Sequence, residues 1–282
     1  MGALRKAFRE HSRRWRDFRY VYPVIARRSR GLSLGINLNP DQVCSFNCIY
    51  CCVDRPTGRR AQHINLSELE TELKALAATS EQLFQEPEFR EIPPEYRRLN
   101  DFAFSGDGEP TAVPVFPLAV RIAAGARSEL HLRDVKIVLI TNAAYLNRAP
   151  VVDALRLLDE SNGEIWAKLD AGTPEYFAKV NRSRFELDHV LANILATAKV
   201  RPIVIQSLFM RIAGEAPPPG EVTAYLERLR GLLKAGAQLK GVQVYTVARK
   251  PPTTTVEPLP TAELEEIAAR VRGVGVPATV YP

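Results

Sequence analysis

Val43-Cys44-Ser45-Phe46-Asn47-Cys48-Ile49-Tyr50-Cys51-Cys52 is a short segment that contains all four cysteines of this 282-residue chain. The first three, Cys44, Cys48 and Cys51, have the spacing C-x3-C-x2-C. Three thiolates this close in sequence can ligate one soft metal centre, because a short loop can turn their sulfurs toward a common point. In an iron–sulfur cluster of four irons, three cysteines would leave one iron open to a small molecule. The segment therefore predicts a metal centre with an open position.

A structural zinc site is the alternative for this segment. Such a site usually has four ligands. Cys52 is adjacent to Cys51, so the two side chains point in different directions, and His63 is the nearest histidine that could substitute. An open [4Fe-4S] cluster fits the spacing better. We expect Cys52 to be a small, buried side chain rather than a ligand.

The composition limits the cellular setting. Hydrophobic residues make up 46% of the chain, yet no apolar run approaches the ~18 residues of a membrane span. The N-terminus lacks an apolar signal core. Clustered cysteines in a chain without an export signal favour metal binding over disulfides. The sequence thus predicts a cytoplasmic protein with no membrane partner.

The positive charge is concentrated at the N-terminus. Residues 1–30 contain ten Lys or Arg and two acidic residues, a net charge of +8, whereas the remainder carries −2. We therefore expect a basic N-terminal extension, 1–30, before a domain of residues 31–282. The extension could bind an anionic partner such as RNA. Alternatively, its aromatic residues could pack it against the domain as a solvated basic face.

Hydrophobic periodicity predicts an α/β fold. A helix is expected over 3–20, a helix over 67–79 opened by a Ser67-x-x-Glu70 capping box, and an irregular insertion over 80–100. Six strands alternate with helices, which implies parallel pairing and an open or partial (β/α)6 barrel. A doubly wound sheet is the alternative, but no G-x-G-x-x-G or Walker-type loop is present. The expected strands are 32–38, 101–105, 135–141, 164–170, 202–210 and 239–247, with a short last strand at 278–281, and the later helices are 115–127, 149–159, 174–181, 186–199, 221–234 and 261–271.

Polar residues gather where these strands end. In parallel β/α architectures, sites form at the carboxyl ends of the strands. The segment of four cysteines follows the first strand, and further polar groups follow the other five. The sequence therefore predicts one rim of functional side chains: Gly106 to Glu109, Thr141 and Asn142, Lys168 and Asp170, Gln206, Ser207 and Arg211, and Gln243, Tyr245 and Val247.

The C-x3-C-x2-C segment, with Tyr50 before its third cysteine, resembles the signature of the radical S-adenosylmethionine (SAM) superfamily. The resemblance implies a [4Fe-4S] cluster held by Cys44, Cys48 and Cys51, with SAM chelating the fourth iron. It implies that the reduced cluster cleaves SAM to a 5′-deoxyadenosyl radical, which abstracts hydrogen from a substrate. It also implies a partial (β/α)6 barrel and a one-electron reductant such as flavodoxin or ferredoxin.

The resemblance extends to Gly106-Asp107-Gly108-Glu109-Pro110, which is similar to the family motif that contacts the SAM amino group. Without the resemblance, this is a glycine-rich turn with a carboxylate. The remaining expectations are SAM or substrate contacts, each with a structural alternative. Thr141 and Asn142 would meet the ribose or carboxylate of SAM, or form a turn. Ser207 and Arg211 are further candidates for ribose or carboxylate contacts, and Tyr50 and Val247 would flank adenine.

Lys168 and Asp170 lie two residues apart on an expected strand, so both face one side of the sheet. A buried Lys–Asp pair is costly unless it is used or mutually satisfied. We expect the pair to contact SAM or substrate as catalytic residues.

The segments 26–37, 107–111 and 168–172 resemble a branch related to the wyosine tRNA-modifying synthases. Those enzymes use a second cluster, but this chain has no cysteine outside residues 44–52. The substrate is therefore unidentified: RNA or a nucleoside is favoured by the basic extension, and a small molecule or peptide is the alternative. A zinc-stabilised α/β binding module is the non-enzyme alternative.

Overall fold

The computed structural model describes residues 4, 7–8, 12–53, 55, 63–249 and 251–282. The chain forms two compact units. The first comprises residues 1–43, 57–140 and 148–164, and the second comprises residues 44–56, 141–147 and 165–282. Within the described residues, no helix has both the length and the apolar character needed to cross a membrane.

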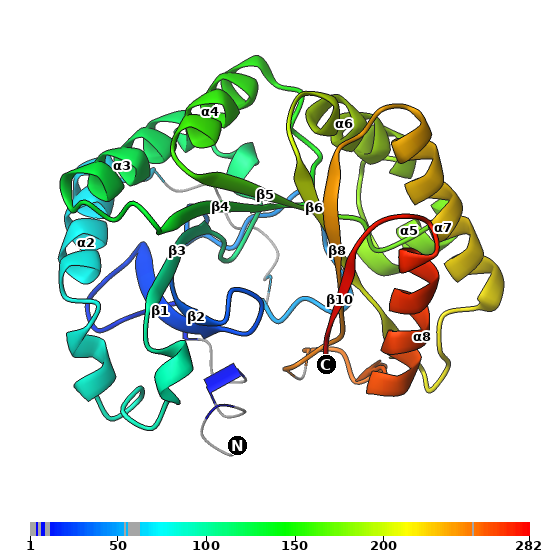
Figure 1. The fold of residues 1–282 in the computed structure, drawn as a ribbon, viewed down its shortest axis with the longest axis horizontal. Coiled ribbons are helices and arrows are strands. Elements are labelled where there is room, and N and C mark those ends of the chain that lie inside the picture. Colours follow the sequence, from blue (N-terminus) through cyan, green and yellow to red (C-terminus); the bar gives the residue numbers. More distant parts are fainter. Residues whose placement is uncertain (1–3, 5–6, 9–11, 54, 56–62, 250) are drawn as a thin grey trace. The chain divides into compact units, whose positions relative to one another are not determined.

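In the described part of the first unit, the strands follow the order β1-β2-β3-β4 (Figure 1). β1 pairs antiparallel with β2, whereas β2, β3 and β4 are parallel. Every residue of β2 is buried, as expected for a strand covered on both faces. The strands are β1 (Val21–Ala26), β2 (Gly31–Ile36), β3 (Leu99–Phe104) and β4 (Lys136–Thr141), the helices are α2 (Leu66–Ala78), α3 (Phe116–Glu129) and α4 (Ala149–Glu160), and three 3-10 turns are η1 (Gln82–Gln85), η2 (Pro94–Tyr96) and η3 (Pro110–Ala112).

The second unit contains parallel strands in the order β5-β6-β8-β10. A separate antiparallel ribbon joins β7 to β9. The elements are β5 (Gly163–Lys168, whose first two residues belong to the first unit), α5 (Pro174–Asn181), α6 (Leu187–Val200), β6 (Ile203–Leu208), β7 (Met210–Ile212), α7 (Pro219–Lys234), β8 (Leu239–Tyr245), β9 (Val256–Pro258), α8 (Thr261–Arg272) and β10 (Ala278–Tyr281).

The expected alternation of parallel strands and helices is confirmed. Helix 174–181 and the short strand 278–281 have the predicted bounds. Strands β1, β7 and β9 were not predicted. The expected strand 202–210 is divided into β6 and β7, because the chain leaves the parallel sheet after Leu208 and pairs with β9 instead.

The predicted helix over 3–20 is wrong for residues 12–20. Residues 4, 7 and 8 are helical, and residues 3, 5–6 and 9–11 lie outside the described part of the chain. Trp15 and Phe18 instead form an isolated antiparallel bridge. The carboxylate of Glu72, on α2, accepts hydrogen bonds from the backbone N–H groups of Arg19, Tyr20 and Val21 at 2.7, 2.8 and 2.9 Å. These three N–H groups are therefore bound to a side chain rather than to helical carbonyls.

The capping box predicted at Ser67 and Glu70 is also wrong. α2 begins at Leu66, so Ser67 already lies in its first turn. Asn65 is the N-cap, and its side-chain oxygen accepts a hydrogen bond from the backbone N–H of Glu68 at 3.2 Å. Asparagine is a favoured N-cap residue, and the N-cap lies two positions earlier than the Ser-x-x-Glu pattern suggested.

Candidate functional site

The backbone of the cysteine segment, residues 44–52 (the cysteine loop), is attached to the end of α5. The N–H of Asn47 donates to the carbonyl of Asn181 at 3.2 Å, and the N–H of Ile49 donates to the carbonyl of Val180 at 2.9 Å. These carbonyls belong to the last turn of α5, where helical partners run out. The side chain of Ile49 is buried in a core cluster with Val180. The C-terminal end of α5 therefore fixes the conformation of the cysteine loop.

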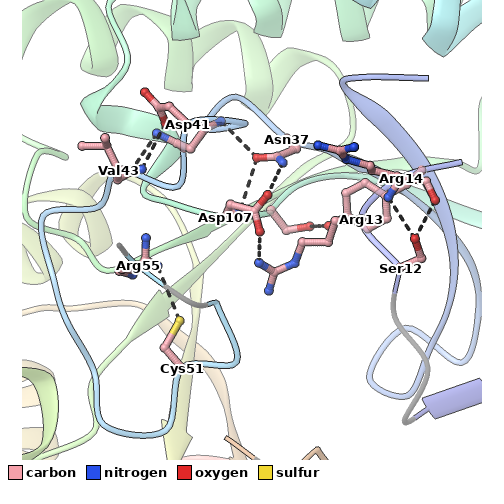
Figure 2. Close-up of polar contacts among 12 residues, drawn as sticks. Ser12, Arg13, Arg14, Asn37, Asp41, Val43, Cys51, Arg55 and Asp107 are labelled. Carbon is pink, nitrogen blue, oxygen red and sulfur yellow. Dashed lines mark hydrogen bonds and ion pairs between the residues drawn. The ribbon is translucent and has the colours of Figure 1, made fainter. Parts of the chain in front are cut away.

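None of the four cysteines forms a disulfide, and each is half-buried, so Cys52 is less buried than expected. The side-chain amide of Asn181 lies 3.5 Å from Cys48 Sγ, in position to donate to it. The guanidinium of Arg55 donates to Cys51 Sγ at 3.4 Å (Figure 2). Two of the three candidate ligand sulfurs thus have an N–H donor directed at them, which is the environment of a sulfur that carries negative charge.

Burial, and after it the nearby Asp170 carboxylate, raise the pKa of the Cys48 thiol to about 12. A thiolate at this position therefore needs a cation close by, which a bound metal centre would supply. Within the described residues, no three His, Cys, Asp or Glu side chains are gathered closely enough to hold a metal ion. The sulfur donor set suits an iron–sulfur cluster in its chemistry, and the assignment of Cys44, Cys48 and Cys51 as its ligands stays a prediction from their spacing.

Asp170 is the centre of a buried hydrogen-bond network behind the cysteine loop. One carboxylate oxygen accepts from the Tyr50 hydroxyl at 2.5 Å and from the Asn181 amide at 2.9 Å. The other accepts from the backbone N–H of Leu208 at 2.9 Å and lies 3.5 Å from Lys168 Nζ. The Asp170 side chain is 0% exposed. It therefore links the cysteine loop to α5, β5 and the end of β6.

Lys168 is enclosed by the same network. Its Nζ donates to the Tyr245 hydroxyl at 2.6 Å and lies 4.9 Å from the centre of the Tyr50 ring. Burial acts to lower the pKa of Lys168, but Asp170 and Tyr245 outweigh it, and the net pKa is raised. The ammonium is thus charged and paired with Asp170. The structure brings Lys168 and Asp170 together as expected and makes them mutually satisfied, while their contact with SAM or substrate stays a prediction.

Thr141 and Asn142 form the turn after β4. Thr141 Oγ1 accepts from the N–H of Ala143, and Asn142 Oδ1 accepts from the N–H of Ala144, both at 3.0 Å. Asn142 Nδ2 also donates to Ser45 Oγ of the cysteine loop at 2.9 Å. The turn-forming role is therefore observed, and Asn142 adds a second attachment for the cysteine loop.

The candidates on the later strands have structural partners. Ser207 is fully buried, and its hydroxyl lies 2.6 Å from the Tyr225 hydroxyl. Arg211 forms an ion pair with Glu263 and donates to the carbonyl of Gly214 at 2.9 Å. Val247 packs against the core cluster that contains Ile49. These contacts account for the side chains, and their ligand roles stay predictions.

In the first unit, the segment Gly106–Pro110 (the glycine loop) is anchored to the end of β2. Asn37 Nδ2 donates to Asp107 Oδ2 at 2.6 Å, and Asn37 Oδ1 accepts from the N–H of Asp107 at 3.2 Å. Arg13 forms an ion pair with the same carboxylate (Figure 2). A β-carbon at Gly108 would overlap the carbonyl oxygen of Val43 and the side chain of Asn39. Glycine at 108 is therefore required by packing against residues 39–43.

Glu109, the expected partner of the SAM amino group, is 2% exposed. One of its carboxylate oxygens accepts from the backbone N–H and the hydroxyl of Thr111, at 3.2 and 2.5 Å. It thus caps η3.

The sequence alone did not identify Asn37, Arg13 or Asn181 as residues of the site. Asn37 follows a strand and could have been found by that position, whereas Asn181, at the end of a helix, carries no such signal.

No family model matches the sequence. The chain is 28% identical over 183 residues to UPF0026 protein slr1464 of Synechocystis sp., a match that covers 63% of this chain and 58% of that protein. It is 25% identical over 169 residues to GTPase Obg of Brachyspira hyodysenteriae, covering 59% of this chain and 21% of that protein. The matches therefore span between 21% and 58% of these relatives' own lengths.

Solved structures give a clearer likeness. A radical SAM methyltransferase from Sphaerobacter thermophilus is similar with a TM-score of 0.61 at 14% identity, over 89% of this chain and 66% of that chain. The fold is the partial barrel of radical SAM enzymes. Streptococcus suis SuiB is similar with a TM-score of 0.56 at 13% identity, over 90% of this chain and 51% of that chain. TYW1 is similar with a TM-score of 0.50 at 15% identity, over 97% of this chain and 82% of that chain. The partial-barrel fold class expected from the sequence is confirmed.

Proposed function

We propose that the chain is a radical SAM enzyme that binds one [4Fe-4S] cluster through Cys44, Cys48 and Cys51, together with SAM. The observation that carries the proposal is the C-x3-C-x2-C spacing in a loop that follows β2 of a radical SAM partial barrel. When bound, the reduced cluster would supply the electron that cleaves SAM and yields the 5′-deoxyadenosyl radical. The chain's part is to hold the three sulfurs, orient SAM and exclude water.

The proposal assigns the SAM contacts by their resemblance to the family pattern. Glu109 would bind the SAM amino group, and the loop of Gly106, Asp107 and Gly108 would present it. Two observations support a cofactor beside the second unit's polar residues. The side-chain oxygens of Asn181 and Gln206 are buried and have no hydrogen-bond partner among the described residues. Thr141, Asn142, Ser207, Arg211, Tyr50 and Val247 are the remaining proposed SAM contacts, and Lys168 and Asp170 are proposed to act at the substrate or SAM.

The direct test is the product of SAM cleavage. Anaerobically reconstituted protein with SAM and a strong reductant is expected to form 5′-deoxyadenosine and methionine. The Cys48→Ala variant serves as the matched control, because it removes one proposed ligand, and is expected to form neither. A reconstituted wild-type protein that holds its cluster but leaves SAM intact would overturn the proposal.

We further propose RNA or a nucleoside as the substrate class, on the net charge of +8 in residues 1–30. In this proposal, the chain belongs to a branch that resembles the wyosine tRNA-modifying synthases but lacks the cysteines for their second cluster. The structure shows part of this extension packed on the first unit: Trp15 meets Phe89 with ring centres 5.8 Å apart, and Arg16 pairs with Glu86. The exposed cations Arg14 and Arg30 remain candidates for phosphate contacts.

Electrophoretic binding to tRNA tests this assignment. Replacing Arg14 and Arg30 with glutamine leaves the aromatic packing in place and is expected to weaken binding and to reduce the salt slope by about one per lost phosphate contact. Arg156→Gln, which alters an exposed arginine of α4, is the control. Absence of tRNA binding by the wild-type protein would instead favour a small molecule or peptide as the substrate.

The proposed function also includes a one-electron reductant, such as flavodoxin or ferredoxin, and a cytoplasmic location.

A further inference from the structure

Asn181 occupies a particular place at the end of α5. Its backbone carbonyl accepts from Asn47 of the cysteine loop, while its side-chain amide lies 3.5 Å from Cys48 Sγ and 2.9 Å from Asp170 Oδ2. The residue is 1% exposed. A buried amide normally satisfies its hydrogen-bonding groups. Here the amide N–H groups are directed at a carboxylate and at a candidate ligand sulfur.

The Asp170 carboxylate sets the orientation of this amide. Because a carboxylate only accepts hydrogen bonds, the Asn181 group that faces it must be the NH2 rather than the carbonyl. Asp170 cannot turn away, since it also accepts from Tyr50 and from the backbone of Leu208. The same constraint therefore fixes the NH2 of Asn181 toward Cys48.

The charges around Cys48 determine the direction in which Asn181 shifts the reduction potential of the cluster. Reduction adds negative charge to a cluster, and an N–H donor to a ligand sulfur stabilises that charge. Asp170 would oppose reduction, but Lys168 lies 3.5 Å from its carboxylate and offsets its charge. Of the two tyrosines in this network, Tyr50 donates its hydroxyl to Asp170 and Tyr245 accepts from Lys168. Burial raises the pKa of Tyr50, so its hydroxyl keeps the proton that it donates. The Asn181 donor thus favours the reduced state.

We infer that Asn181 is a positioning residue of the cluster site: held by Asp170, it donates an N–H···S hydrogen bond to Cys48 and raises the reduction potential of the cluster. This inference rests on the proposed function, because it requires the cluster at Cys48. It does not depend on the substrate. Asp170 then affects the cluster indirectly, by holding the side chain of Asn181 toward Cys48.

The test is a redox titration of the reconstituted cluster, followed by electron paramagnetic resonance. Asn181→Leu removes the donor and is expected to shift the midpoint potential to a more negative value, by about tenfold in the reduction equilibrium, or ~59 mV for one electron. Asn181→Asp adds a negative charge and is expected to shift it further. Asn100→Leu is the matched control, since Asn100 donates to the carbonyl of Ser29 in the first unit, and its potential should equal that of the wild type.

The outcomes separate this inference from the proposed function. A wild-type protein that binds no cluster overturns both. An Asn181→Leu protein with full iron content and the wild-type potential overturns the inference alone. If both Asn181 variants fail to bind the cluster, the wild-type protein labelled with 15N in its asparagine side-chain amides decides the question. A nitrogen hyperfine coupling to the reduced cluster supports the hydrogen bond, and absence of that coupling refutes it.

Discussion

The cysteine loop and the glycine loop are held in place by different kinds of contact. The cysteine loop is fixed by a buried polar network in which Asp170 accepts from Tyr50 and Asn181. The glycine loop is fixed by two hydrogen bonds between Asn37 and Asp107, by an ion pair with Arg13, and by close packing of Gly108 against residues 39–43. The contrast teaches that both loops depend on polar partners, whereas the glycine loop depends in addition on the absence of a side chain at Gly108.

The largest expected effect is loss of the proposed ligands of the cysteine loop. Cys44→Ala, Cys48→Ala and Cys51→Ala should each abolish cluster binding, because three thiolates are the minimum that the proposal assigns. Iron and sulfide analysis after anaerobic reconstitution measures this. Cys52→Ala is the matched control and should retain the cluster. Loss of the cluster in Cys52→Ala would show that the ligands are misassigned.

Removal of Asp170 should have the next largest effect. Asp170→Ala leaves Lys168 buried and charged without its partner, and breaking a buried pair in this way costs about 3–5 kcal/mol. The free energy of unfolding of the metal-free protein in urea measures the loss. Asp153→Ala removes an exposed carboxylate, 68% exposed, and should change it by less than about 0.5 kcal/mol. Equal effects of the two substitutions would contradict a structural role for Asp170.

A methyl group at the glycine loop should be disruptive for steric reasons. Gly108→Ala places a β-carbon against backbone and side-chain atoms of residues 39–43, which should cost about 1–3 kcal/mol of unfolding free energy. Gly125→Ala, on α3, meets no atom within 4 Å and should stabilise the protein by up to about 1 kcal/mol through helix propensity. The sign of the effect should therefore differ between the two glycines. Stabilisation by Gly108→Ala would refute the packing argument.

The ion pair at the edge of the glycine loop should contribute least. Arg13 and Asp107 are 21% and 15% exposed in their side chains, so their coupling should be about 1 kcal/mol and should fall in high salt. A double-mutant cycle with Arg13→Gln and Asp107→Asn measures this coupling. The exposed pair Arg156–Asp153 is the control, with less than about 0.5 kcal/mol. A coupling of zero would mean that residues 12–20 are attached by other contacts, such as that of Trp15.

The sequence predicted what is periodic or local. The alternation of strands and helices produced the α/β class and the bounds of α5, because each β/α unit repeats its own hydrophobic pattern. It failed at residues 12–20, where Glu72, more than 50 positions further along the chain, binds three backbone N–H groups. It also missed β1, which contains a proline at position 23, a residue that is uncommon within strands.

In the candidate site, too, local sequence features could be predicted and contacts between distant residues could not. The cysteines are recognisable because their spacing is itself the motif. Their supports are not, because Asn181 is 133 residues from Cys48, and Arg13 is 94 residues from Asp107. The role of Gly108 as a packing glycine was equally hidden, since the carbonyl of Val43 that it meets has no sequence signature. Such partners become visible only when the tertiary structure brings distant segments together.

The content of the metal centre tests the central claim most directly. Protein reconstituted anaerobically with iron and sulfide is expected to contain roughly four irons and four sulfides per chain, held by three thiolates. The Cys52→Ala variant should give the same stoichiometry. Stoichiometric zinc without iron, in wild-type protein purified and reconstituted under the same conditions, would contradict the account and favour a zinc-stabilised binding module.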